Sequence, residues 1–372
     1  MTAAQAAGAL GVTRATLYAY ASRGQLRSEP VSSRTRERRY LREDIDRLRE
    51  RKEARRDPAK VAARGLQWGS PVLESGITLI REGRLYYRGQ DAIALAQHAN
   101  LETVAELLWQ GERLFEQPRA RVPRVSANAE PLSLCQATLP LAGAADPAAY
   151  DLRPDAVRHA GARIVRLMAA IIGGRELRGP VHMVWGAKVA EVVRSALVLC
   201  ADHELNVSAF TARCAASAGA SPYDVVAAAL ATVKGHRHGG QSERVTAMML
   251  EPRGIENRLR RGESVPGFGH PLYPDGDPRA VMLLRLAETG PNREAWRQVR
   301  RVWKAGRDLL GEHPNVDFAL AAVARVYRLS EHAPIILFAL GRTVGWIAHA
   351  IEQYSSGQLI RPRAHYTGPS PA

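Results

Sequence analysis

The feature that most constrains the fold of this chain is a long series of amphipathic segments between residues 102 and 354. In each segment alanine, leucine and valine recur every three or four residues, which is the period of an α-helix. Helices are predicted over 102–110, 134–142, 155–172, 190–201, 222–233, 278–288, 292–310, 316–328 and 334–354. No strands alternate with them, so Rossmann and barrel folds are disfavoured. We therefore expect a mainly α-helical body.

A short extended pair precedes these helices. Residues 77–80 and 84–89 are rich in β-branched and aromatic side chains, and Glu82 and Gly83 lie between them, which predicts a β-hairpin. The chain has 372 residues, of which 46% are hydrophobic and 24% charged, as in globular proteins of two or three domains. The apolar run 333–340 is too short for the ~20 residues of a membrane span, and we see no export signal.

The cysteines predict the redox environment. Cys135, Cys200 and Cys214 lie in apolar or alanine-rich surroundings and are odd in number. They indicate buried, reduced thiols and neither a disulfide framework nor a zinc site. We therefore expect a cytoplasmic protein with no membrane partner.

The positive charge is concentrated near the N-terminus. The whole chain carries a net charge of +15, and residues 1–64 hold 16 Arg or Lys against 8 Asp or Glu. Residues 2–24 predict two helices joined by a turn at Gly11, with Thr13 as the N-cap of the second helix. The small apolar core of this segment would consist of Ala6, Ala7, Leu10, Val12 and Leu17.

The order of these elements resembles a winged helix-turn-helix of the MerR or excisionase type. Residues 34–40 would form the basic wing and residues 42–48 a further helix, giving a domain over 1–56 and a linker over 57–70. The residues expected to contact DNA are Arg14, Arg34, Arg36, Arg38 and Arg39. The alternative is a small helical adaptor whose basic face is merely solvated.

The segment 266–279 is unsuited to a helix or a strand, because it holds three glycines and four prolines in fourteen residues. It presents His270 directly after Gly269, and Arg279 nine residues later. An imidazole that titrates near neutral pH and a planar guanidinium suit the binding and protonation of a carboxylate-bearing substrate. An ordinary surface turn is the alternative.

Polar islands interrupt the helical body at six places: 202–206, 235–240, 266–279, 315–317, 341–345 and 359–363. Together they supply His203, His238, His270, Asp317, Arg279, Arg342 and Arg361. A zinc site built on His203, His236 and His238 is disfavoured, because the spacing lacks a nearby carboxylate ligand. A serine hydrolase is disfavoured because no Gly-x-Ser-x-Gly sequence occurs.

In this order, the islands resemble the citrate synthase family over about residues 70–366. The resemblance implies a two-domain helical fold, with a large domain over 71–239 and 329–372 and a small domain over 240–328. The small domain would close over the substrates about hinges near 239–240 and around residue 328. It also implies an enzyme that condenses acetyl-CoA with oxaloacetate and hydrolyses citryl-CoA, with acetyl-CoA as co-substrate and no permanently bound cofactor.

The resemblance assigns roles to the island residues. Asp317 would be the base that removes a methyl proton, while His238 donates a hydrogen bond to the thioester carbonyl. His270 would protonate the ketone of oxaloacetate, and His203 would bind the keto acid. The carboxylates would be held by Arg279, Arg342 and Arg361. Because the family's equivalent of Arg361 comes from the other subunit, the resemblance implies a homodimer.

Two departures from the family pattern concern coenzyme A. Pro271 and Pro274 stand where basic residues that contact the coenzyme are common, and His236 and Arg237 stand where Pro-Leu is usual. Arg237 is the one candidate that we retain for a coenzyme contact. Propionyl-CoA as substrate, giving 2-methylcitrate, is an alternative, and so is a ligand-sensing regulator that binds DNA through residues 1–56.

Overall fold

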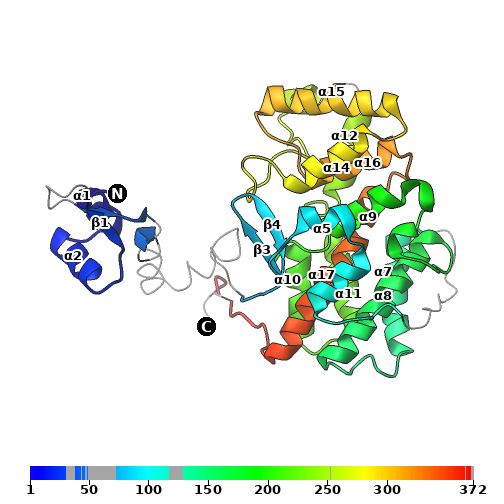
Figure 1. Ribbon diagram of the computed structural model, residues 1–372, viewed down its shortest axis with the longest axis horizontal. Coiled ribbons are helices and arrows are strands. Elements are labelled where there is room, and N and C mark those ends of the chain that lie inside the picture. The colour runs from blue at the N-terminus through cyan, green and yellow to red at the C-terminus, as the bar shows by residue number, and fades with distance from the viewer. Residues whose placement is uncertain are drawn as a thin grey trace. The chain divides into compact units, whose positions relative to one another are not determined.

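The computed structural model describes residues 1–30, 38–42, 44–46, 48, 73–116, 129–251, 253–364 and 366–369. The chain forms two compact units, Met1–Glu74 and Ser75–Ala372 (Figure 1). Arg34, Arg36 and the linker predicted over 57–70 lie outside the described residues. The domain limits predicted above, including the division of the body at 240 and 328, stay predictions.

The N-terminal unit contains α1 (Ala3–Leu10), α2 (Arg14–Ser22), β1 (Ser28–Pro30) and β2 (Arg38–Tyr40). As predicted, Thr13 caps α2, since its hydroxyl accepts a hydrogen bond from the Thr16 N–H at 3.2 Å. β1 and β2 pair antiparallel. The described residues of the segment predicted as a helix over 42–48 are helical.

The core of this unit is larger than the sequence predicted. Val12 is only half-buried, because it packs at the margin, whereas Ala6, Ala7, Leu10 and Leu17 are buried as expected. Leu26, Tyr40 and Ile45 complete the core. These three residues come from outside the two helices, so only the tertiary fold brings them to the core.

The body begins with the predicted hairpin. β3 (Thr78–Arg81) pairs antiparallel with β4 (Arg84–Tyr87), and Ile80 lies opposite Leu85. Glu82 and Gly83 form the turn, with φ angles of 52° and 71°. A short third strand, β5 (Gln90–Asp91), pairs with β4 and was not predicted.

All nine predicted helices are present, with ends that differ by up to three residues. They are α6 (Leu101–Trp109), α7 (Pro131–Ala144), α8 (Pro154–Gly173), α9 (Ala190–Leu199), α11 (Pro222–Val233), α14 (Pro278–Glu288), α15 (Arg293–Leu310), α16 (Val316–Val326) and α17 (Ala333–Ser356). The sequence analysis missed α5 (Ala92–His98), α10 (Val207–Ser217), α12 (Gln241–Leu250), α13 (Gly254–Arg260) and the 3-10 turns Val181–Met183 and Ala187–Val189. These missed elements are short or lack a continuous apolar stripe, so their pattern alone is weak.

Helix α17 runs through the core of the body. It packs against α6, α8, α9, α10, α11 and α16. Within the described part of the chain it is the one helix long and apolar enough to cross a membrane, and almost all of its apolar window is buried inside the body. Of the three free cysteines, Cys135 and Cys200 are buried as predicted, but Cys214 is only partly buried.

Helices α12, α14, α15 and α16 gather at one end of the body, with α15 outermost (Figure 1). The loop that contains His270 and the first turn of α16, with Asp317, belong to this end. His203, His238 and Arg342 lie on elements outside this group. The predicted site residues therefore come from two sides of the body.

Candidate active site

The His270 loop is fixed to the segment that leads into α16. The Gly269 N–H donates to the His313 carbonyl at 2.8 Å, and the Asn315 N–H donates to the Gly267 carbonyl at 2.9 Å. Gly267 and Gly269 have φ angles of 88° and 71°, which other residues adopt only with strain. These bonds bring His270 and Asp317 to the same site, although they are far apart in sequence.

Three rings form the centre of the site. The His203 and His270 ring centroids are 5.2 Å apart in an edge-on arrangement, and Tyr273 lies 4.9 Å from the His270 ring. The Tyr273 hydroxyl is 3.0 Å from Nε2 of His203. The sequence analysis missed Tyr273, because an aromatic residue in an irregular loop is equally typical of a side chain that only packs against its neighbours.

Both of these histidines are held neutral at pH 7. Burial, and then the charge of Arg279, lowers the pKa of His270 to about 4. Burial and the guanidinium groups of Arg279 and Arg342 hold the pKa of His203 well below its usual range. Nδ1 of His270 accepts the Leu272 N–H at 3.2 Å, so in the neutral ring the proton is on Nε2. The neutral ring of His270 therefore has Nε2 as its donor atom.

The turn that carries His203 is held in place by contacts of its neighbour Asp202. The neighbouring Asp202 is fully buried, and its Oδ2 accepts a hydrogen bond from the Thr78 hydroxyl at 2.6 Å. Its Oδ1 lies 3.3 Å from Nε2 of His349 on α17. Gly345 allows the close approach, since a Cβ there would lie 2.4 Å from Oδ1 of Asp202. The hairpin and α17 together set the position of His203.

Arg279 is buried and already paired within the chain. Its Nε and Nη2 atoms donate to the two carboxylate oxygens of Asp277 at 2.9 and 2.8 Å. Asp277 also accepts the Val316 N–H at 3.0 Å, which ties this pair to α16. Asp277 was not predicted as a site residue. Among the described residues nothing accepts a hydrogen bond from Nη1, so this side of the guanidinium is left for a ligand.

Arg342 is buried with an incomplete set of partners. Its Nε donates to the Cys200 carbonyl at 2.8 Å, but neither Nη1 nor Nη2 has a hydrogen-bond partner among the described residues. Burial lowers its pKa, which means that the charged form lacks full compensation. A bound carboxylate would supply both missing acceptors in the bidentate geometry of a guanidinium.

His238 lies close enough to Arg342 to feel its charge, and its ring contacts the Ser208 hydroxyl. Its Nε2 is 2.9 Å from the Ser208 hydroxyl, which also receives the Trp346 indole N–H at 3.1 Å. Burial, with the charge of Arg342, lowers the pKa of His238 to about 4. The Ser208 hydroxyl donates its one proton to Oδ1 of Asn206 at 2.8 Å, so in this arrangement Nε2 of His238 is the donor to Ser208. The sequence analysis missed Ser208, although it follows the island 202–206 by two residues.

Asp317 differs from the histidines in its electrostatics. Burial raises the pKa of its carboxyl group to about 7, although Arg279 and Arg342 act in the opposite direction. Its carboxylate accepts no hydrogen bond from any residue in the described ranges, and the side chain is half-buried. A carboxylate that is poorly solvated and titrates near neutral pH is suited to act as a general base.

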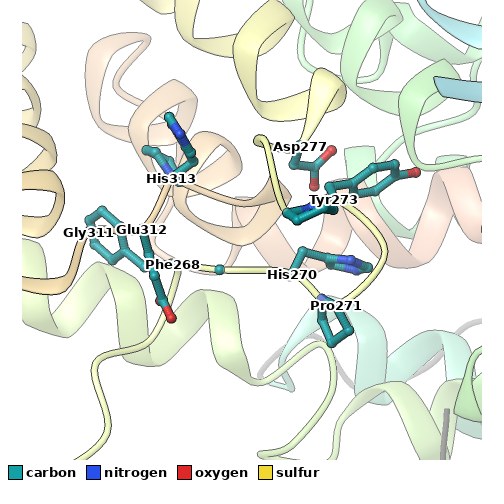
Figure 2. Close-up of a pocket in the computed structure, with 11 residues that line it drawn as sticks. Phe268, His270, Pro271, Tyr273, Asp277, Gly311, Glu312 and His313 are labelled. Atoms are coloured by element: carbon teal, nitrogen blue, oxygen red, sulfur yellow. The ribbon is translucent and has the colours of Figure 1, made fainter. Parts of the chain in front are cut away.

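A pocket of about 460 Å³ opens beside this centre. Figure 2 shows His270, Pro271 and Tyr273 on one side of it and Phe268 and Glu312 on the other. Pro271, Pro274 and Glu312 line it, and no Arg or Lys does.

The remaining predicted residues lie elsewhere. Arg361 is exposed on the segment that follows α17, and no hydrogen bond or ion pair joins its side chain to another residue in the described ranges. Arg237 and His236 are exposed. In the N-terminal unit Arg14 and Arg39 are exposed, while Arg38 donates hydrogen bonds to Ser28. The described residues contain no group of three His, Cys, Asp or Glu placed to share a metal ion.

The fold and these side chains define a helical enzyme whose site contains two buried arginines, a carboxyl group with a raised pKa and neutral histidines. Residues 65–363 match the family described as citrate synthase, C-terminal domain, and residues 1–57 match the MerR HTH family of regulatory proteins. The chain belongs to the citrate synthase family, whose members are acyltransferases that convert an acyl group into an alkyl group on transfer. The predicted family and fold are confirmed.

Several relatives support this assignment. The chain is 30% identical to citrate synthase 2 of Bacillus subtilis (strain 168), over 83% of this chain and 96% of that protein. It is 29% identical to 2-methylcitrate synthase of Mycobacterium tuberculosis (strain H37Rv), over 76% and 84%. Citrate synthase from Thermotoga maritima MSB8 superposes with a TM-score of 0.70 at 25% identity, covering 82% of this chain and 95% of that one. Citrate synthase from Thermoplasma acidophilum, solved with carboxymethyl coenzyme A and oxaloacetate, shares the fold with a TM-score of 0.71 at 23% identity, covering 83% and 97%.

Proposed function

We propose that this protein condenses acetyl-CoA with oxaloacetate and hydrolyses the resulting citryl-CoA to citrate and CoA. The observation that carries the proposal is the pair of unpartnered, buried Nη atoms of Arg342, in a site that also contains the weakly acidic Asp317. An anionic substrate would satisfy the arginine, and the carboxylate would remove a proton from a carbon acid.

The first step forms the nucleophile. Asp317 removes a proton from the methyl group of the thioester, and His238 donates a hydrogen bond to the thioester oxygen as it becomes an enolate. For this step the Ser208 hydroxyl turns from Oδ1 of Asn206 to Nε2 of His238, which leaves the ring proton on Nδ1. His238 is neutral, and the Ser208 hydroxyl keeps its Nε2 occupied at 2.9 Å. A fixed donor at the point where negative charge develops lowers the barrier to proton removal.

The second step joins the two substrates. The enol carbon attacks the ketone of oxaloacetate, and His270 donates the Nε2 proton to the ketone oxygen. Arg342 binds one substrate carboxylate in a bidentate manner, and Nη1 of Arg279 binds the other. His203 is placed to contact the keto acid, because its ring lies edge-on to that of His270. Water then cleaves the thioester, which releases CoA.

The reaction needs no permanently bound cofactor, since acetyl-CoA is a co-substrate. The three free cysteines suit a reducing compartment, and we place the enzyme in the cytoplasm. The coenzyme contacts are not assigned, and Arg237 stays a candidate.

Release of free CoA thiol in the presence of oxaloacetate and acetyl-CoA tests the activity. The variants Asp317→Ala and His238→Ala should each lower kcat by about 100-fold or more, because a general base or an oxyanion donor typically contributes that much. Full activity in either variant would contradict the role given to that residue.

The choice of acyl group is a separate question, because relatives of both kinds match the chain. We favour acetyl-CoA. One methylene changes binding in an apolar pocket by about 1–3 kcal/mol, so kcat/KM for acetyl-CoA should exceed that for propionyl-CoA by about tenfold or more. A higher kcat/KM for propionyl-CoA would make this a 2-methylcitrate synthase.

We further propose that Arg361 completes the site of a partner subunit in a homodimer. The support is its exposed position after α17, where no hydrogen bond or ion pair with a described residue engages its side chain. Mixing Arg361→Ala and Asp317→Ala variants should restore part of the activity, because mixed dimers then contain one intact site. Absence of rescue, with mixed dimers demonstrated, would contradict a shared site.

We propose that the N-terminal unit binds DNA. The support is the MerR match, the capped helix α2 with the exposed Arg14, and the exposed Arg39 on β2. In a gel-shift titration with genomic fragments, replacement of Arg34, Arg36, Arg38 and Arg39 by alanine should strongly weaken retardation at low salt. Turnover should persist after removal of residues 1–64. Two outcomes would favour the alternative, a ligand-sensing regulator that binds DNA. One is that the folded body without residues 1–64 shows no turnover. The other is that the full chain binds DNA but shows no turnover.

A further inference from the structure

Helix α15 bears a row of positive charge on its outer face. Its exposed cations are Arg293, Arg297, Arg300, Arg301, Lys304 and Arg307. Its only acidic residues are Glu294 and Asp308, at the two ends. We refer to these six cations as the cationic face. Figure 1 shows α15 as the outermost helix at its end of the body.

The described residues do not balance the charges of the cationic face. Arg307 lies 3.7 Å from Asp308, and Arg293 donates to the Glu288 carbonyl. No ion pair or hydrogen bond with a described residue engages the side chains of the other four cations. Residues spaced by three or four positions are neighbours on a helix, so like charges such as those of Arg297 and Arg301 repel and destabilise it. A helix that is simply solvated would mix charges of both signs.

The opposite face of α15 holds the helix in a fixed orientation. Trp296 and Val299 are buried, and Gly306 packs so closely against Phe268 that a Cβ would lie 2.1 Å from its ring. The cationic face therefore cannot turn inward to find partners. At 1.5 Å per residue, the stretch from Arg293 to Arg307 presents its cations over about 21 Å.

We propose that the cationic face of α15 binds the phosphate backbone of duplex DNA. A duplex carries one negative charge per ~1.7 Å of axis, so a helix of this length can contact several phosphates at once. Five of the six cations are arginines, which bind phosphate in a bidentate manner. A membrane surface is a poorer match, because the apolar residues of α15 other than Leu309 are buried or half-buried and leave no apolar face for the lipid. This surface is independent of the DNA-binding role proposed for the N-terminal unit.

The test compares full-length variants in a DNA-binding titration at several salt concentrations. The test variant replaces Arg297, Arg300, Arg301 and Lys304 with glutamine, which retains helix propensity. A matched control replaces four other exposed cations of the body, Arg113, Arg175, Arg178 and Lys188, in the same way. Both are also made in a background with Arg14 and Arg39 replaced by alanine, so that binding by the N-terminal unit is weakened separately.

We expect the α15 variant to bind a duplex at least about tenfold more weakly than the control at about 50 mM salt, with a log–log salt slope smaller by up to about 3.6. In the background with Arg14 and Arg39 replaced by alanine, some salt-dependent DNA binding should remain. This remaining binding should disappear when the four α15 cations are also replaced by glutamine. Equal affinity of the α15 variant and the control would overturn the proposal. So would tighter binding of single-stranded RNA than of duplex DNA, or an increased KM for acetyl-CoA, since the face would then serve RNA or the coenzyme. Circular dichroism melting confirms that the variants are folded.

Discussion

At the scale of single residues, the site combines three neutral histidines, His203, His238 and His270, with a carboxyl group that titrates near pH 7. The pKa values of His238 and His270 are lowered to about 4, whereas that of Asp317 is raised to about 7. Only the carboxyl group changes charge near neutral pH. We expect kcat/KM to rise with pH through about 7, as Asp317 becomes ionised. A profile that is flat between about pH 5 and pH 9 would contradict Asp317 as the base.

The same residue should reduce stability at high pH. Because the pKa of Asp317 rises from 3.8 to about 7 on folding, the folded state holds the proton more tightly, and stability falls as pH rises from about 4 to about 7. Asp317→Asn removes this penalty and should raise the free energy of unfolding above pH 7 by up to about 4 kcal/mol. Below pH 4 it should have little effect. Denaturant melts at both pH values measure this difference, and equal effects at both would refute it.

At the scale of elements, the close contact between α17 and the turn after α9 sets the position of His203. A Cβ on Gly345 would lie 2.4 Å from the Ala201 carbonyl and from Oδ1 of Asp202. Gly345→Ala should therefore destabilise the body by about 1–3 kcal/mol and also lower kcat/KM for oxaloacetate. Gly8→Ala in α1, where no atom lies within 4 Å, is the control and should leave both quantities unchanged or slightly improved. A folded Gly345→Ala enzyme with normal kinetics would show that the contact does not position His203.

At the scale of the whole molecule, the site residues come from two sides of the body. Asp317 and His270 belong to the end formed by α12, α14, α15 and α16, and His238 and Arg342 belong to the rest. We expect oxaloacetate with an unreactive CoA analogue to draw these parts together and exclude water, which should reduce the radius of gyration. Solution scattering measures the change. Arg342→Leu should prevent it, and identical profiles with and without ligands in the wild type would rule closure out.

The sequence by itself determined the helical architecture and predicted most of the candidate site residues. The nine long helices follow from local apolar periodicity, and the loop at 266–279 follows from its glycine and proline content, because both depend on neighbours along the chain. Only the tertiary structure showed that Asp277 occupies two donors of Arg279, that Tyr273 and Ser208 hold the histidines, and that Arg342 keeps two donors unpartnered. These contacts join segments up to about 140 positions apart, and no local pattern encodes such a pairing. The pKa shifts could not be predicted from the sequence either, because they arise from burial, and burial is a property of the packed molecule.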